Sequence, residues 1–207
     1  MAFDVNKIRL EFPSLNQKIN GNSLVYFDSA ATSLKPKLVI DSLAEFYSTI
    51  NSNVHRASHY LSALSTNAYE QARNKVAKFI NAGTNEIVFT SGTTDSINTI
   101  ANSLGQNYLK KSDEVIITVA EHHSNIVPWV ELKEKIGIEI KVLNLNSSGE
   151  LDVEELESLI GEKTKLISFC HTSNVMGIRN DIEGIMKIAK KHGFVDFDRW
   201  SSGYYSY

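Results

Sequence analysis

Apolar positions change their period along the chain, and the change separates predicted helices from predicted strands. Three early segments, 4–12, 37–50 and 61–80, carry apolar residues at helical spacing. From residue 86 onwards, short apolar runs alternate with helical stretches. The predicted strands are 24–27, 87–89, 114–118, 138–145 and 165–170. The predicted later helices begin near residue 94 and then cover 125–136, 152–160 and 181–191.

Alternation of strand and helix predicts an α/β fold with a mainly parallel sheet covered by helices on both faces. In such sheets ligands bind outside the carboxyl ends of the strands, where the connecting loops gather. Three polar loops follow predicted strands, at 91–94, 120–125 and 171–174. We therefore expect these three loops to form the functional site.

The first of these loops has the composition of an anion site. Gly92 allows close approach of backbone to a ligand, and the helix that follows presents free N–H groups and the positive end of its dipole. Thr93 and Thr94 add hydroxyl donors. The alternative is that Ser91, Thr93 and Thr94 only cap the helix. Neither a Walker A loop nor a Gly-x-Gly-x-x-Gly fingerprint is present, so a phosphate outside a nucleotide is favoured.

The other two loops carry imidazole and amide groups. His122 and His123 could stack on an aromatic ligand, move protons or bind a metal, or they could cap a helix and face solvent. Zinc is disfavoured and no metal ligand is assigned, because the surrounding ligand set is incomplete. Asn174 can offer both donors and acceptors to a ligand. Cys170 lies within an apolar strand, which predicts an inert thiol.

Composition narrows the class of protein. The 207 residues are 42% hydrophobic, enough for a core, and the net charge of −3 gives no basic excess for binding nucleic acid or an anionic membrane. The single cysteine excludes an internal disulfide framework. No signal peptide or membrane-length apolar run appears, so a cytoplasmic location is expected.

Five motifs together resemble those of one enzyme family. In order they are 26–33 (YFDSAATS), 53–56 (NVHR), 89–94 (FTSGTT), 121–129 (EHHSNIVPW) and 171–177 (HTSNVMG). This series is similar to that of the group II, or SufS-type, cysteine desulfurases, and the resemblance covers about residues 1–193. It implies a fold-type-I transferase of the class V aminotransferase group that depends on pyridoxal 5'-phosphate.

The resemblance also implies residue roles. Thr93 and Thr94 would hold the cofactor phosphate, His122 would stack over its ring, and Asn174 would contact the cofactor hydroxyl or the substrate carboxylate. Four further residues match motifs near the substrate mouth: Ala30, Ala31, His55 and Arg56. The family converts L-cysteine to L-alanine and passes the sulfur, as a persulfide, to an acceptor protein of iron–sulfur cluster assembly. Its members are homodimers.

Two catalytic motifs of the family are not in this sequence. The Schiff-base lysine stands in a Ser-Gly-His-Lys-like motif and the nucleophilic cysteine on a later loop, and neither is found among the 207 residues. We therefore expect residues 1–193 to form the N-terminal half of the transferase, partial in its large domain and inactive by itself. An incomplete sheet should leave an unpaired edge and exposed apolar surface.

Residues 194–207 depart from the family pattern. The family continues into Asp-Gly-Ala-Gln, whereas this chain reads Asp-Arg-Trp-Ser-Ser at 198–202. Allowed codons for these five residues, shifted by one base, encode Ile-Asp-Gly-Ala-Gln at the expected spacing. The sequence thus suggests a frameshift shortly after Gly193. The alternative is a divergent natural terminus.

Two other functions stay open from sequence alone. A selenocysteine lyase or another class V enzyme would share the fold and the cofactor. A non-catalytic remnant or interaction module could instead pair with an intact protomer. Cofactor absorbance and sulfide release from cysteine would separate an enzyme from a remnant.

Overall fold

The computed structural model of this chain describes residues 3–192. Contacts divide the chain into two compact units, Met1–Val76 and Ala77–Tyr207, named here the first and second units. The tail 194–207 and the suggested frameshift lie outside the described residues. The prediction that 1–193 belong to one partial large domain stays a prediction.

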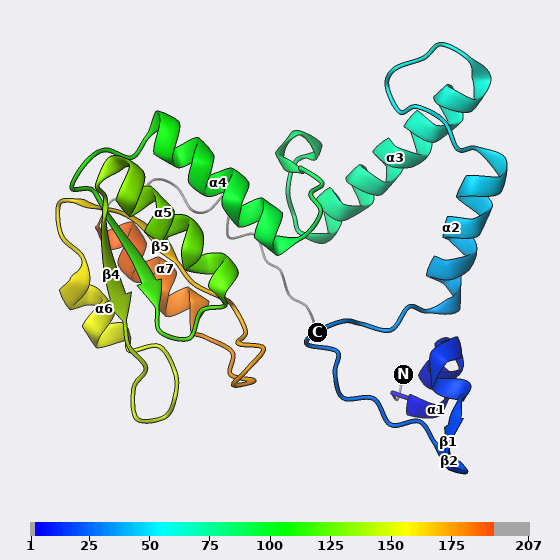
Figure 1. Cartoon of the computed structure of the whole chain (residues 1–207), viewed down its shortest axis with the longest axis horizontal. Coiled ribbons are helices and arrows are strands. Elements are labelled where there is room, and N and C mark those ends of the chain that lie inside the picture. Colours follow the sequence, from blue (N-terminus) through cyan, green and yellow to red (C-terminus); the bar gives the residue numbers. More distant parts are fainter. Residues whose placement is uncertain (1–2, 193–207) are drawn as a thin grey trace. The chain divides into compact units, whose positions relative to one another are not determined.

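A three-stranded parallel sheet forms the centre of the second unit (Figure 1). Its strands are β3 (Glu114–Thr118), β4 (Glu139–Leu143) and β5 (Thr164–Ser168), in the order β4-β3-β5. In the register, Ile116 of β3 stands between Lys141 of β4 and Ile167 of β5. The central strand β3 is buried from Val115 to Thr118, and its apolar run 115–117 is typical of a buried parallel strand.

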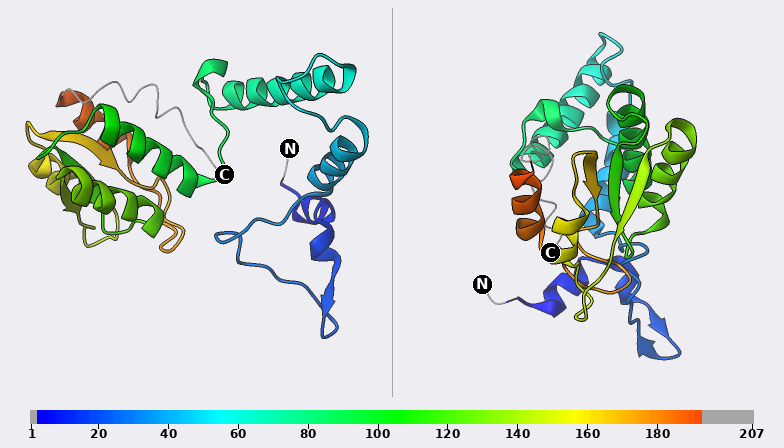
Figure 2. Two further views of the ribbon diagram at one scale, coloured as in Figure 1. Left: turned by 45° about the horizontal axis from the view of Figure 1, so that its top comes forward. Right: turned by 90° about the vertical axis from the view of Figure 1, so that its left-hand side faces the viewer.

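Helices cover both faces of this sheet, and Figure 2 (right) shows the strands between them. Helices α4 (Thr93–Asn107) and α5 (Val127–Ile136) pack on the face that carries Val115 and Ile117. Helices α6 (Val153–Leu159) and α7 (Ile182–Lys191) pack with Ile116 on the opposite face. The predicted α/β fold with a parallel sheet and two helical layers is confirmed.

Local sequence signals set several helix boundaries in this unit. Asp152 and Asp181 precede α6 and α7, and their carboxylates accept hydrogen bonds from the amides of Glu155 and Gly184. Gly105 lies where α4 crosses α5, and a Cβ there would come within 2.4 Å of Leu132 Cδ2. Aspartate caps and a small residue at the crossing therefore place these helices against the sheet.

The first unit consists of short elements joined by irregular chain. It contains α1 (Val5–Leu10), the 3-10 turn Pro13–Asn16, the hairpin of β1 (Lys18–Ile19) and β2 (Asn22–Ser23), α2 (Lys37–Thr49) and the greater part of α3 (Tyr60–Phe79). The three early helices occur where the apolar period predicts them. No helix within residues 3–192 is long and apolar enough to cross a membrane.

Two predicted strands, 24–27 and 87–89, are wrong. The chain after the 3-10 turn Thr84–Glu86 is extended at Ile87 (φ −97°, ψ 121°), but no strand is formed there or at 24–27. Ile87 is buried, whereas Val88 is 78% exposed. β-branched and aromatic residues favour an extended backbone, but a strand also needs a partner with which to exchange hydrogen bonds. The three-stranded sheet in the described residues supplies none to these segments.

Candidate cofactor-binding site

The first turn of α4 presents an uncapped helix N-terminus. Gly92 precedes the helix with φ 149° and ψ 179°, a conformation that L side chains rarely adopt, and it provides no side-chain cap. Thr93 and Thr94 begin the helix and are exposed. The backbone N–H groups of the first turn are therefore available to an anion, together with the positive end of a 15-residue helix.

Hydrogen bonds on the flank of this turn fix its shape. The Thr90 and Ser96 hydroxyls lie 2.8 Å apart, and the Asp95 carboxylate accepts from the Ser91 amide at 3.0 Å. No side-chain hydrogen bond caps the first turn of α4. The alternative that Ser91, Thr93 and Thr94 cap the helix with their side chains is thus not what the structure contains.

His122 follows β3 and caps the short 3-10 turn His123–Asn125. Its Nδ1 accepts a hydrogen bond from the Ser124 amide at 3.1 Å, so the neutral imidazole carries its proton on Nε2. The ring is exposed, and the His123 ring meets it edge to face at 6.1 Å. The capping role weighed from sequence is confirmed locally, and it orients an imidazole whose faces remain accessible to an aromatic ligand.

Asn174 stands on a narrow loop that follows β5. Thr172 and Arg179 pair as an antiparallel bridge, and the Ser173 amide donates to the Ile178 carbonyl oxygen at 2.9 Å. Asn174 is exposed at the turn that these pairs close. The loop extends beyond the carboxyl edge of the sheet, where it is drawn in orange in Figure 1.

Three of the predicted loops gather at one edge of the sheet. β3 and β5 are parallel neighbours, so the segments bearing His122 and Asn174 leave the same edge. Helix α4 leads by a short turn into β3 and contacts the His123–Asn125 turn, which brings its first residues to that edge as well. The structure thus brings Thr93 and Thr94 to the sheet edge that also carries His122 and Asn174.

The other four predicted residues belong to the first unit. Ala30 and Ala31 lie in an exposed turn in which the Ala31 amide donates to the Asp28 carbonyl oxygen at 3.1 Å. His55 has a left-handed backbone (φ 61°), and its Nε2 lies 3.0 Å from Glu70 Oε1. Arg56 follows it and is exposed. Their place at a substrate mouth stays a prediction.

Cys170 is a poor nucleophile in this structure. Burial, and after it the charge of the nearby Glu121 carboxylate, raises the pKa of its thiol to about 11. The thiolate is therefore scarce at neutral pH, as the inert thiol predicted from sequence requires. Across residues 3–192, no three His, Cys, Asp or Glu side chains group so as to hold a metal ion.

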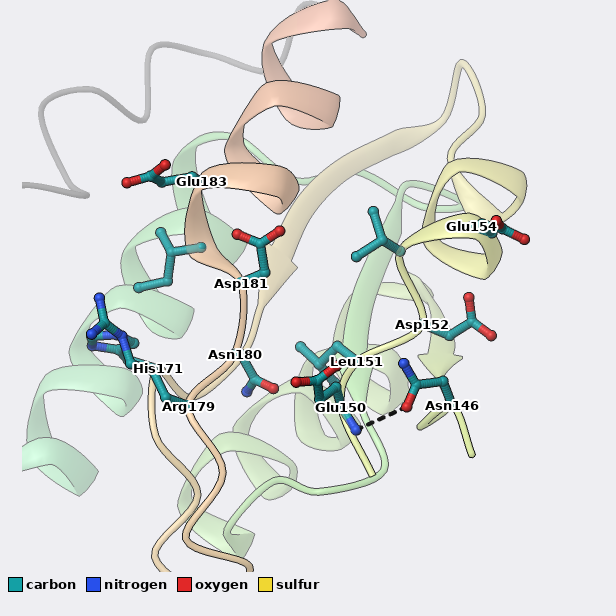
Figure 3. A pocket seen from close by; sticks show the side chains of 12 residues that line it. Asn146, Glu150, Leu151, Asp152, Glu154, His171, Arg179, Asn180, Asp181 and Glu183 are labelled. Carbon is teal, nitrogen blue, oxygen red and sulfur yellow. Dashed lines mark hydrogen bonds between the residues drawn. The ribbon is translucent and has the colours of Figure 1, made fainter. Parts of the chain in front are cut away.

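Sequence reasoning missed one cavity, of about 660 Å³, beside the β5 loop (Figure 3). His171, Arg179 and Asn180 from that loop line it, together with side chains from the starts of α6 and α7. Its carboxylates are those of Glu150, Asp152, Glu154, Asp181 and Glu183. These five carboxylates would repel a phosphate. The candidate anion site therefore stays at the start of α4 and is not assigned to this cavity. The sequence signals near it were the aspartates that start α6 and α7 and the polar loop 171–174, which contains His171.

Comparison with known proteins defines the class first. The model of the aminotransferase class-V family matches residues 25–197, and the chain belongs to this family. The family depends on pyridoxal 5'-phosphate. A solved C-DES mutant with glycine covalently linked to its PLP cofactor, 20% identical with a TM-score of 0.77, shares the fold.

Within that family, the relatives named here are cysteine desulfurases. A probable cysteine desulfurase of Synechocystis sp. is 49% identical over 187 residues, which are 90% of this chain and 44% of the relative. The cysteine desulfurase of Synechococcus elongatus is 43% identical over 194 residues, 93% of this chain and 31% of the relative. The chain is therefore a cysteine desulfurase homologue.

Solved structures agree with this relationship. The apo cysteine desulfurase from Thermococcus onnurineus NA1 matches with a TM-score of 0.85 and 36% identity, over 94% of this chain and 46% of that one. The Escherichia coli cysteine desulfurase CsdA matches with a TM-score of 0.79 and 36% identity, over 94% and 48%. The chain spans less than half the length of each of these relatives.

Proposed function

We propose that the second unit supplies the phosphate and ring contacts for pyridoxal 5'-phosphate in a cysteine desulfurase. The observation that carries this proposal is the uncapped first turn of α4, with Thr93 and Thr94 exposed beside it. A phosphate dianion suits free N–H groups, hydroxyl donors and a positive helix end. The exposed imidazole of His122 suits the aromatic half of the same molecule, so the residues present fit the cofactor.

Each residue then has a defined task. Thr93 and Thr94 donate hydrogen bonds to the phosphate, and the Ser124 amide orients His122 to lie against the ring. Asn174 binds the cofactor hydroxyl or the substrate carboxylate through its amide group. When bound, the cofactor supplies the electron sink that this class of chemistry needs.

The reaction of the whole enzyme would convert L-cysteine to L-alanine. The sulfur would leave on the thiol of a protein cysteine as a persulfide, for transfer to an acceptor protein of iron–sulfur cluster assembly. Cys170 is not proposed for that role, because its thiol pKa is raised to about 11 by burial and by Glu121. A sulfur acceptor must be a thiolate near neutral pH.

We infer that these 207 residues bind the cofactor without turning over cysteine. The sequence contains no Ser-Gly-His-Lys motif, and its lone cysteine is protonated at neutral pH. The phosphate and ring contacts are therefore the part of the function that this chain can be tested for.

Titration of the chain with pyridoxal 5'-phosphate, followed by absorbance and fluorescence, tests the proposal. The double variant Thr93→Val and Thr94→Val should bind at least about tenfold more weakly, because hydrogen bonds to a charged group contribute about 1.5–3 kcal/mol each. Thr99→Val, an exposed threonine farther along α4, is the matched control and should bind like the unmodified chain. Pyridoxal, which lacks the phosphate, should bind all three alike. Equal affinity of the double variant for the phosphorylated cofactor would rule out the assigned anion site.

A further inference from the structure

The carboxylate of Glu121 receives hydrogen bonds from three donors at the end of the sheet. Thr118 Oγ1 donates to Glu121 Oε1 at 2.7 Å, and the Cys170 amide donates to the same oxygen at 2.9 Å. Asn125 Nδ2 donates to the other oxygen, Oε2, at 2.8 Å. Thr118 and Asn125 are buried. One side chain thus joins β3, the 3-10 turn after it and the chain that leaves β5.

Asn125 extends this network into the core. Its Oδ1 accepts from Ser168 Oγ at 2.6 Å and from Trp129 Nε1 at 3.0 Å. Trp129 is 2% exposed and belongs to the apolar cluster under α4 and α5. The hydrogen bonds of Glu121 are therefore connected, through Asn125, to the closely packed core of the second unit.

The two segments that Glu121 joins are those that carry the candidate ring and substrate contacts. Glu121 immediately precedes His122, and Cys170 immediately precedes the loop that bears Asn174. Asn180, at the other end of that loop, donates from its side chain to the Cys170 carbonyl oxygen at 2.8 Å. The peptide groups on both sides of Cys170 are consequently held, one of them by Glu121.

We propose that Glu121 is a positioning residue whose carboxylate ties the His122 segment to the base of the Asn174 loop. The proposal rests on the cofactor site proposed above and deepens it. Glu121 itself touches neither cofactor nor substrate. Its charge matters because three donors converge on it, and a glutamine at this position would place an N–H group against at least one of them.

Three variants of the full chain separate this role from general stability. Glu121→Gln keeps the volume but turns an acceptor into a donor. Ser168→Ala removes the hydrogen bond from Ser168 to Asn125 without a change of charge. It is the test variant if Glu121→Gln does not fold. Glu155→Gln is the matched control, because Glu155 also accepts two hydrogen bonds from a loop after a strand, those of the Asn144 amide (2.9 Å) and side chain (2.7 Å).

Hydrogen–deuterium exchange of segments 119–126 and 169–174 is the first measurement, and cofactor affinity is the second. Glu121→Gln should exchange at least about tenfold faster in both segments and bind pyridoxal 5'-phosphate at least about tenfold more weakly. Ser168→Ala should shift both in the same direction by less, and Glu155→Gln should change neither.

Reactivity of Cys170 gives a signature that loss of stability alone would not produce in a folded variant. It is the only cysteine, so the pH dependence of its alkylation rate reports the pKa of its thiol. Loss of the Glu121 charge should lower the thiol pKa. Each unit by which this pKa falls raises the thiolate fraction at neutral pH about tenfold. The shift should appear in Glu121→Gln and not in Ser168→Ala, which keeps the carboxylate.

The outcomes distinguish this proposal from the one on which it rests. Unchanged exchange in the two segments of Glu121→Gln would overturn the positioning role. Faster exchange with unchanged cofactor affinity would also overturn it, because the link would then not serve the site. If the unmodified chain binds no cofactor while Glu121→Gln still exchanges faster, the cofactor site fails and the link between the segments stands.

Discussion

The two units of the chain differ in what holds them together. In the second unit, apolar side chains from three strands and four helices form a buried cluster on each face of the sheet. In the described part of the first unit, the buried side chains are those of Ser62 and Ser65, which donate to the carbonyl oxygens of Asn53 and Ile50. Leu43 of α2 is 59% exposed, whereas Leu156 of α6 is fully buried.

This contrast shows that an amphipathic pattern predicts a helix more reliably than it predicts burial. The apolar stripe of α2 forms a helix at the expected residues, yet Leu38, Leu43 and Tyr47 remain exposed in the structure. The backbone hydrogen bonds of a helix form within one segment, whereas burial needs a second surface. The exposed apolar surface expected from sequence is thus found mainly outside the sheet layers.

The largest expected effect comes from matched leucine truncations in the two units. Leu156→Ala should lower the free energy of unfolding of the second unit by about 2–5 kcal/mol, because it leaves a cavity in a packed cluster. Leu43→Ala removes the same atoms from an exposed site in the first unit. It should change the measured free energy of unfolding by about 0.5 kcal/mol or less. Urea unfolding followed by circular dichroism measures both. Similar losses would mean that α2 is packed as tightly as α6.

An intermediate effect is expected from the helix caps. Asp152→Ala removes the bond from the Glu155 amide (3.0 Å) and should cost the second unit about 1 kcal/mol. Asp4→Ala removes the bond from the Asn6 amide (3.1 Å) at the start of α1, and should leave the unfolding of the second unit unchanged. Thermal unfolding of the two variants checks this. A comparable drop for Asp4→Ala would show that the units unfold as one.

The smallest effect concerns Glu114 at the start of β3. Burial alone would raise the pKa of this carboxyl, but hydrogen bonds from Lys141 and Thr164 and the charges of Lys141 and Lys163 outweigh burial and hold the pKa below its usual value. The carboxylate therefore stabilises the second unit above the usual pKa of a glutamate, and this contribution disappears as the pH falls through the lower folded-state pKa. Glu114→Gln should cost about 1 kcal/mol or less at pH 7, and less once the pH falls through the folded-state pKa.

Acid titration of stability checks the sign of that contribution. The difference in unfolding free energy between Glu114→Gln and the unmodified chain should shrink as the pH falls from 5. Lys37→Ala, which breaks the exposed pair between Lys37 and Asp41 (2.8 Å) in α2, is the control and should show little difference at any pH. A difference that grows on acidification would contradict the assigned direction of the Glu114 pKa shift.

Much of the second unit follows from local sequence. The run 114–118 has an apolar centre at 115–117 and becomes β3 with those bounds, and Asp152 and Asp181 mark the starts of α6 and α7 by their capping chemistry. The segment 87–89 shows where this reasoning stops. Its residues favour an extended backbone, but pairing depends on a neighbouring strand that local sequence does not specify.

The residues of the candidate site also differ in whether local sequence predicts them. Gly92, Thr93 and Thr94 could be predicted because a strand-like run, a glycine and a helix start carry a local signature of anion binding. Glu121 could not, because its partner Cys170 is 49 residues away and only the parallel pairing of β3 with β5 brings them together. The roles of His122 and Asn174 came from family motifs, and the fold supports them by placing both at one edge of the sheet.

Hydrogen–deuterium exchange of the chain with and without saturating pyridoxal 5'-phosphate tests whether the start of α4 and the His122 segment bind the cofactor. We predict slower exchange at the first-turn amides of α4, at 119–126 and at 171–174, with no change in α6 or α7. Slower exchange confined to the cavity beside α6 and α7, or no change anywhere, would contradict the assignment of the cofactor site to the start of α4 and the His122 segment.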